Sequence, residues 1–151
     1  RHDRILTILM EWILKKVKPT CSVYADLNMP GVLPVTDIFI SLRPDIAIIN
    51  GNILETLELT VCHETNFQKS KLYKMAKYQT SLVEDIKHDF KYLNVINHTI
   101  EISNLGFCSD KPCFKLKCLE NNNIEDIQSK LIFSAVTSSY GIYCNRNLNI
   151  L

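Results

Sequence analysis

Hydrophobic residues recur at helical spacing in three segments of the chain. In residues 3–17, apolar side chains return every three or four positions, Asp3 is placed to cap the helix, and Pro19 ends it. Residues 66–87 predict a long amphipathic helix with lysines on its polar side, and a final helix is predicted within residues 123–143. The apolar face of the long helix is predicted to consist of Leu72, Met75, Ala76, Gln79, Leu82, Val83 and Ile86.

Shorter apolar runs predict the strands. Residues 42–49 and 56–61 are strand-like and are separated by Asn50-Gly51-Asn52, a strong signal for a tight turn, so they predict a β-hairpin. Three further strands are predicted at residues 21–25, 92–96 and 99–102. The order of helix, hairpin, helix, strands and helix predicts the α/β class, with a central mixed sheet covered by helices in a small α/β/α sandwich.

The composition agrees with one globular domain that spans residues 1–151. Of the 151 residues, 46% are hydrophobic and 22% are charged, which is enough for one proper core. The six cysteines form no paired metal-binding motif, so we expect reduced thiols. No apolar run approaches the roughly 20 residues that cross a bilayer, which predicts a soluble, intracellular protein without a membrane partner.

The charges are balanced overall but uneven along the chain. Lysine and arginine number 17 against 16 acidic residues, so the net charge of +1 gives no global attraction to nucleic acid. Basic residues nevertheless gather in residues 1–18 and again between Lys69 and Lys77. Local patches of this kind contact phosphates without reading a sequence.

Two acidic residues of the predicted hairpin, Asp45 and Glu58, are the main candidates for chemistry. Side chains alternate along a strand, and the hairpin places the two strands side by side, so the carboxylates converge if their faces coincide. Carboxylates among apolar neighbours are costly to bury unless they are satisfied, and a divalent cation such as Mg²⁺ or Mn²⁺ is the usual solution. In the alternative interpretation, Asp45 caps the turn or pairs with Arg43, and Glu58 faces solvent. The histidines show no ligand spacing.

Several motifs extend this pattern beyond the acid pair. Arg43-Pro44-Asp45 is followed after twelve residues by Glu58-Leu59-Thr60-Val61. The other motifs are Arg1-His2-Asp3, Glu64 and Lys74-x-x-Lys77-Tyr78. Together they resemble the signature of the PD-(D/E)XK restriction-like endonuclease superfamily, and they are most like the endonuclease domain of site-specific non-LTR retrotransposons. The resemblance covers a core motif region of about residues 1–105, with the helical extension after it.

The resemblance implies a single nuclease-like domain with the restriction-endonuclease-like form of the α/β/α sandwich. It implies an endonuclease that hydrolyses phosphodiester bonds of DNA with an Mg²⁺ or Mn²⁺ ion held by Asp45, Glu58 and the backbone carbonyl of Leu59. It further implies single-strand nicking for a mobile element, a reverse transcriptase in the same polyprotein, and a nuclear location.

The chain departs from this family at one position. Thr60 stands where the family's usual lysine follows the second acid, so the resemblance assigns the lysine's role to Lys74 or Lys77 on the next helix. Glu11 on the first helix is a further candidate for a metal or water contact. In the alternative interpretation, both lysines are solvated residues of a helix surface. Two other functions stay open, a catalytically inactive nuclease fold that binds nucleic acid or a protein partner, and an unrelated α/β interaction domain.

Overall fold

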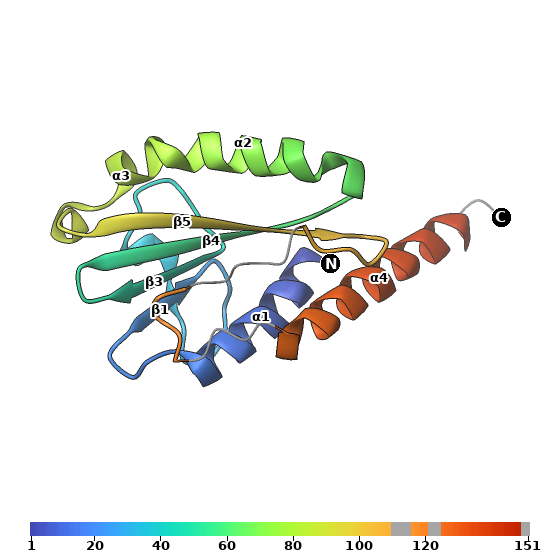
Figure 1. Ribbon diagram of the computed structural model, residues 1–151, viewed down its shortest axis with the longest axis horizontal. Coiled ribbons are helices and arrows are strands. Elements are labelled where there is room, and N and C mark those ends of the chain that lie inside the picture. The colour runs from blue at the N-terminus through green and yellow to red at the C-terminus, as the bar shows by residue number, and fades with distance from the viewer. Residues whose placement is uncertain (110–115, 121–124, 149–151) are drawn as a thin grey trace.

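The protein is built on a five-stranded mixed β-sheet with helices on both faces, which confirms the predicted α/β class. The computed structural model describes residues 1–109, 116–120 and 125–148. The sheet order is β2-β1-β3-β4-β5, with strands β1 Ser22–Ala25, β2 Leu33–Pro34, β3 Ile46–Asn50, β4 Ile53–Cys62 and β5 Asn94–Ser103. The helices are α1 His2–Lys16, α2 Phe67–Gln79, α3 Ser81–Asp85 and α4 Glu125–Leu148, with 3-10 turns at Val35–Asp37, Glu64–Asn66 and His88–Phe90. Figure 1 shows α2 and α3 on one face of the sheet and α1 and α4 on the other.

Strands β3 and β4 form the predicted hairpin, joined by the two-residue loop Gly51-Asn52. Gly51 has a φ of 60°, a conformation that other residues rarely adopt, and glycine at the first loop position suits the tight turns that match the twist of paired strands. β3 begins at Ile46 and not at the predicted residue 42. Pro44 has no N–H to donate to a neighbouring strand, so the segment before Asp45 stays outside the sheet.

Strand β5 is continuous, so the prediction of two separate strands within residues 92–102 is wrong. The polar pair Asn97 and His98 interrupts the apolar pattern in the sequence. In the sheet both side chains contact β4, because Thr56 Oγ1 donates to Asn97 Oδ1 at 2.8 Å and His98 Nε2 lies 3.4 Å from the Glu55 carboxylate. β5 therefore runs parallel to β4 along its whole length.

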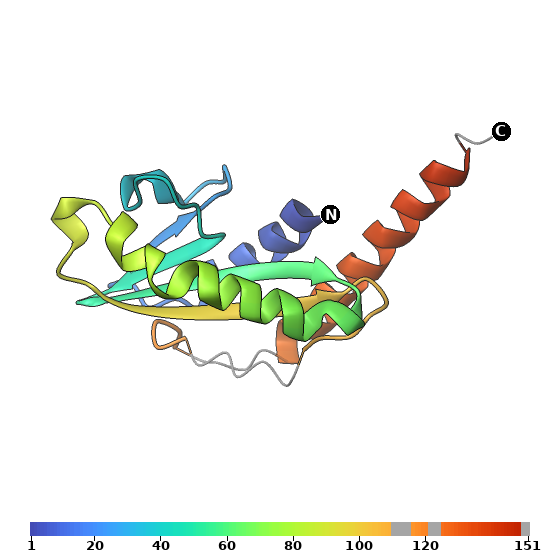
Figure 2. The same cartoon turned by 90° about the horizontal axis from the view of Figure 1, so that it is seen from above.

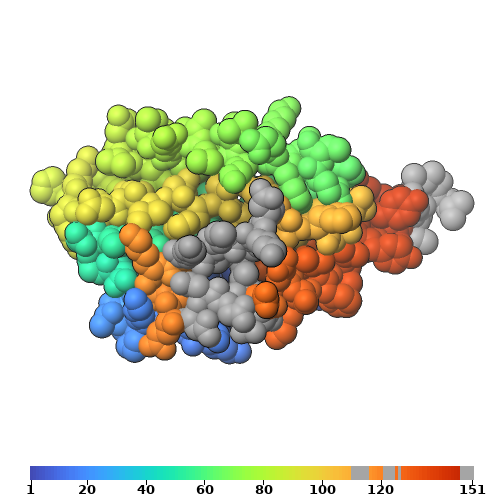
Figure 3. All heavy atoms as spheres, viewed as in Figure 1, coloured from blue at the N-terminus to red at the C-terminus, as the bar shows by residue number. Residues whose placement is uncertain are grey.

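The predicted long helix is in fact two helices, α2 and α3, which meet at Thr80. The prediction of the buried face is wrong for α2. Leu72 and Met75 are 57% and 42% exposed, whereas Tyr78 is buried and the Lys74 side chain is only 24% exposed. In Figures 2 and 3, none of the other elements that the structure describes covers the outer side of α2. The polar face of α2 is turned inward because it meets a buried carboxylate of β4.

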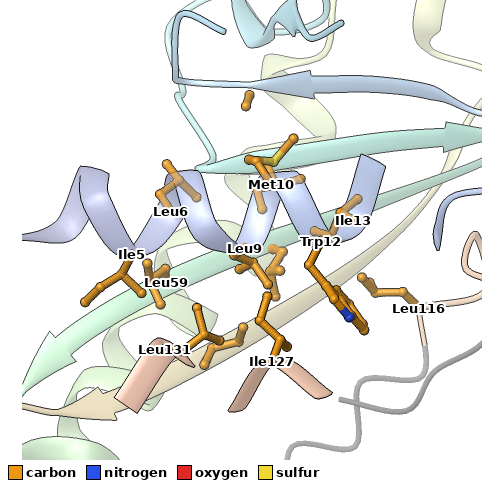
Figure 4. Packing of buried hydrophobic residues seen from close by; sticks show 14 of the residues in the cluster. Ile5, Leu6, Leu9, Met10, Trp12, Ile13, Leu59, Leu116, Ile127 and Leu131 are labelled. Atoms are coloured by element: carbon orange, nitrogen blue, oxygen red, sulfur yellow. The ribbon is translucent and has the colours of Figure 1, made fainter. Parts of the chain in front are cut away.

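Helix α1 covers the opposite face of the sheet and supplies much of the larger core, which it shares with β4 and α4 (Figure 4). The helix begins at His2 with Arg1 at the N-cap position and no side-chain cap, so the predicted Asp3 cap is wrong. Asp3 lies in the first turn, where a negative charge is favoured by the helix dipole. The buried residues of α1 are Ile5, Leu6, Leu9, Met10, Trp12 and Ile13.

Replacing Leu9 by Ala should lower the free energy of unfolding by about 2–5 kcal/mol, because the side chain is fully buried and its removal leaves a cavity. Urea unfolding followed by circular dichroism measures the change. Leu72→Ala is the matched control, since Leu72 is 57% exposed and its loss should change stability by no more than about 0.5 kcal/mol. Equal effects of the two substitutions would contradict the packing described here.

Helix α4 packs beside α1 and extends past the sheet. Its residues Ile127, Leu131 and Ala135 are buried in the same core as α1. Figure 2 shows the C-terminal part of α4 standing clear of the sheet, and Tyr140 and Tyr143 are 68% and 64% exposed there. The helix continues to Leu148, beyond the predicted end at residue 143, while residues 123–124 of the predicted extension lie outside the described part of the chain.

Two smaller predictions concern the thiols and the membrane. The cysteines that the structure describes are free, as expected, and Cys113 lies outside the described residues; the free ones are Cys21, Cys62, Cys108, Cys118 and Cys144. Among the helices in the described ranges, none is long and apolar enough to cross a bilayer.

Candidate metal site

The two predicted acids meet where β3 and β4 part. Pairing between these strands ends at Ile46 and Leu57, so the next positions outward, Asp45 and Glu58, are opposite each other. The Asp45 backbone N–H donates to Glu58 Oε1 at 3.3 Å. The Glu58 side chain is only 1% exposed, which excludes the alternative that it faces solvent. The structure thus brings both carboxylates together at one end of the hairpin.

The parting of the strands also frees the backbone of β4. Beyond its last pair with β3, β4 points the polar groups of Leu59 and Val61 toward an edge without a strand. Asp45 Oδ2 accepts the Leu59 N–H at 2.7 Å, and His2 Nε2 lies 3.2 Å from the Leu59 carbonyl oxygen. The Arg1 guanidinium donates to the Val61 carbonyl oxygen at 3.4 Å. Side chains from α1 and from the segment before β3 therefore fill the place of the missing strand.

Glu58 is enclosed by two residues of α2. Lys74 Nζ lies 2.6 Å from Glu58 Oε2, and Tyr78 lies close enough to the same carboxylate to affect its pKa. Burial and the neighbouring charge of Asp45 raise the pKa of Glu58, although Lys74 and Tyr78 oppose the shift. Burial and the Glu58 charge likewise raise the pKa of Tyr78, which keeps its hydroxyl protonated. Glu58 is thus a desolvated acid held beside a second acid.

The structure distinguishes the two candidate lysines. Lys74 reaches the acid pair directly, whereas Lys77 is exposed and its Nζ lies 4.9 Å from the centre of the Tyr78 ring. Thr60, at the position of the family's lysine, has a buried hydroxyl that makes no hydrogen bond in the described part of the chain. The ammonium group beside Glu58 therefore comes from α2 and not from β4.

His2 belongs to the site, although its spacing in the sequence gives it no role. Its Nε2 lies 3.4 Å from Asp45 Oδ2, in addition to its contact with Leu59. The hydrogen bond to Asp45 raises the pKa of His2 to about 9 against the opposing effect of burial, so the imidazole is protonated at neutral pH. The contact spans more than forty residues of sequence, and the only early sign of it is the Arg1-His2-Asp3 motif.

Glu11 lies apart from this cluster, although the sequence makes it a candidate for a metal or water contact. It lies on the exposed side of α1, nine residues after His2 and so about 13 Å further along the helix axis. The position of α1 that reaches Asp45 is His2. Of the predicted site residues, the structure brings together Asp45, Glu58, Leu59 and Lys74. Lys77 lies against the Tyr78 ring instead, and Glu11 lies apart from the cluster.

Asp85 at the end of α3 anchors the segment that leads to Asp45. Its carboxylate accepts the Ser41 hydroxyl at 2.6 Å, the Leu42 N–H at 2.6 Å and the Ser41 N–H at 2.9 Å. Partial burial opposes ionisation, but these hydrogen bonds outweigh it and hold the pKa of Asp85 below its usual value. The start of β3, and with it Asp45, is tied in this way to the helical layer.

Asp85→Asn should lower the free energy of unfolding at pH 7 by about 1–3 kcal/mol, because the amide cannot accept these hydrogen bonds as a charged group. Since the folded-state pKa is depressed, the contribution of Asp85 is complete above the unfolded-state pKa and is lost as the pH falls through the folded-state pKa. The variant's stability should accordingly fall less than the wild type's on acidification. Urea unfolding at a series of pH values measures this, with exposed Asp89→Asn as the control. Parallel pH profiles of wild type and Asp85→Asn would contradict it.

The oxygen atoms of this cluster fit a small divalent cation. Asp45 and Glu58 offer carboxylate oxygens, and Leu59 offers the carbonyl oxygen that His2 contacts; oxygens of these kinds are the hard ligands that Mg²⁺ and Mn²⁺ prefer. Two positive groups already lie against these oxygens, His2 beside Asp45 and Lys74 beside Glu58. The carboxylates of the cluster therefore attract cationic groups. In the described ranges no group of three or more His, Cys, Asp or Glu side chains could hold a metal. Mg²⁺ does not need three such side chains, since it is commonly held by one or two carboxylates together with water and substrate phosphates.

The residues of this cluster come from α1, the segment before β3, β4 and α2, so only the folded chain assembles it. No protein-family model and no curated protein matches this sequence.

Proposed function

We propose that this chain is a divalent-metal-dependent DNA endonuclease of the PD-(D/E)XK type, with the restriction-endonuclease-like form of the α/β/α sandwich. The observation that carries the proposal is the pair Asp45 and Glu58 at the parting of β3 and β4, with the Lys74 ammonium 2.6 Å from Glu58. The mixed sheet between helical layers is compatible with such a fold. Lys74 takes the role that Thr60 leaves vacant in the family signature.

Each residue of the cluster has a distinct part in the proposed reaction. Asp45, Glu58 and the Leu59 carbonyl would hold Mg²⁺ or Mn²⁺, which lowers the pKa of a bound water and offsets charge on the scissile phosphate. The Lys74 ammonium, kept in place by Glu58 and Tyr78, stabilises negative charge that develops on the phosphate or on the attacking water. Protonated His2 adds a positive charge next to Asp45 that draws the phosphate toward the site.

The wider context of the proposal comes from the sequence resemblance. It supports DNA as the substrate, nicking of one strand for a mobile element, a reverse transcriptase in the same polyprotein, and action in the nucleus. A second candidate is a catalytically inactive nuclease fold that binds nucleic acid or a protein partner. The observation in its favour is Thr60, which replaces the family's lysine and whose buried hydroxyl has no hydrogen-bond partner among the described residues.

A plasmid assay separates the two candidates. Supercoiled DNA is incubated with the chain and Mg²⁺ or Mn²⁺, and nicked circles are measured with and without a chelator. The endonuclease proposal expects metal-dependent nicked circles that the chelator abolishes. Binding of DNA without nicking in either metal would favour the inactive fold.

A further inference from the structure

A groove of about 560 Å³ adjoins the metal site on the side of α1 and α4. It lies between the first residues of α1, the end of β4 and the C-terminal half of α4, which Figures 1 and 2 show close to the N-terminus. His2 connects the two features, because it lines the groove and also contacts Asp45 and Leu59. The groove and the metal site are therefore neighbours that share His2. The groove residues used below are Arg1, His2, Val61, Ser139, Tyr143 and Arg146.

The groove is positively charged. Two guanidinium groups, from Arg1 and Arg146, line it, and no carboxylate is among its lining residues in the described part of the chain. The Arg1 guanidinium is held in place by the Ser139 hydroxyl at 3.2 Å and the Val61 carbonyl at 3.4 Å. A guanidinium fixed at the rim of a groove is suited to phosphate, since its planar fork donates two hydrogen bonds at once.

The groove also has an exposed aromatic side chain. Tyr143 lines it and is 64% exposed, so its ring is accessible to a ligand in the groove. It belongs to α4, whose C-terminal part stands clear of the sheet (Figure 2). Aromatic side chains next to positive charge form the stacking platforms on which proteins bind single-stranded nucleic acids. The face of a base is accessible to such a ring only when the base has left the duplex stack.

We propose that this groove binds an unpaired segment of a DNA strand, with Arg1 and Arg146 on its phosphates and Tyr143 stacked on a base. This inference rests on the proposed nuclease function, which supplies the reason for DNA to be present. It adds that the DNA next to the nuclease site is unpaired. A volume of about 560 Å³ is in the range that encloses a drug-sized ligand, which corresponds to one or two nucleotides. Single-stranded DNA should accordingly bind better than duplex of the same sequence.

Fluorescence anisotropy with a labelled single-stranded DNA oligonucleotide, in the presence of a chelator and over a series of salt concentrations, tests the groove. Tyr143→Ala should weaken binding about tenfold and leave the salt dependence unchanged, because stacking involves no charge. Arg146→Ala should weaken binding and reduce the slope of log affinity against log salt by about 0.7, the value for one phosphate contact to a single strand. The controls are Tyr73→Ala on the outer face of α2 and Lys130→Ala at the other end of α4.

Wild-type affinity in both groove variants, or equal losses in the controls, would overturn the inference. Equal competition by duplex DNA would overturn the assignment to an unpaired strand. Because the chelator prevents cleavage, this result does not depend on the nuclease proposal. Nicking that requires Asp45 while the groove variants bind normally would refute the groove alone. Groove-dependent binding by a chain that never nicks would refute the nuclease alone.

Discussion

Replacing Asp45 by Asn, or Glu58 by Gln, is expected to reduce the rate of metal-dependent DNA nicking by about a thousandfold, because a bound cation supplies several kcal/mol of transition-state stabilisation. Each substitution keeps the size of the side chain and removes one of the two charges that would hold the cation. Single-turnover nicking of supercoiled plasmid measures the rate. Glu11→Gln is the matched control, and since Glu11 is exposed and apart from the cluster, its rate should stay within about twofold of wild type.

Glu58 is buried, so its substitution has a structural effect that must be separated from the catalytic one. The Gln variant leaves the Lys74 ammonium without its partner 2.6 Å away, which destabilises the fold. Circular dichroism and thermal unfolding show whether each variant is folded at the assay temperature. Asp45→Asn is the cleaner test, because the Asp45 side chain is 14% exposed. Wild-type nicking by a folded Asp45→Asn variant would contradict the proposed site.

Lys74→Met is expected to slow nicking by about a hundredfold, the typical effect of removing one group that stabilises charge in a transition state. Lys77→Met, three residues later on the same helix, should change the rate by less than about threefold. The reason is the geometry, since Lys74 Nζ contacts Glu58 while the exposed Lys77 has its Nζ 4.9 Å from the centre of the Tyr78 ring. The same single-turnover plasmid assay measures both rates, with the protein in saturating excess over the DNA so that weaker binding does not lower them.

The two lysine variants also test which lysine takes the role of the lysine in the family signature. A large loss in Lys77→Met with a small loss in Lys74→Met would mean that the helix reorients when substrate binds, against the arrangement seen here. Lys74→Arg provides a further check, because it keeps the positive charge and should retain more activity than Lys74→Met. Equal inactivity of the Arg and Met variants would indicate that Lys74 acts through its size and not through its charge.

The hairpin and its acid pair could be predicted because their signals are local. Gly51-Asn52 fixes the turn, and the alternation of side chains then determines that Asp45 and Glu58 are opposite each other. The break in β5 was predicted wrongly for the opposite reason. Asn97 is polar, but it is satisfied by Thr56 of the neighbouring strand, and such a partner cannot be read from a single segment.

The inward face of α2 and the role of His2 could not be predicted from periodicity. A helix normally buries its apolar stripe, but α2 lies over Glu58, and a buried carboxylate favours Lys74 and Tyr78 beneath the helix over Leu72. His2 reaches Asp45 only because β3 leaves β4 and exposes the backbone of Leu59. Both features arise from tertiary contacts between distant segments, and both are part of the proposed site.

The central claim is that Asp45 and Glu58 together hold a divalent cation. Diffraction from crystals of the chain grown with Mn²⁺, recorded near the manganese absorption edge, locates the metal through its anomalous signal. We expect a peak between the two carboxylates and near the Leu59 carbonyl oxygen, with Lys74 next to it, and no such peak in Asp45→Asn crystals. A peak elsewhere, or no peak in the wild type at saturating Mn²⁺, would contradict the claim.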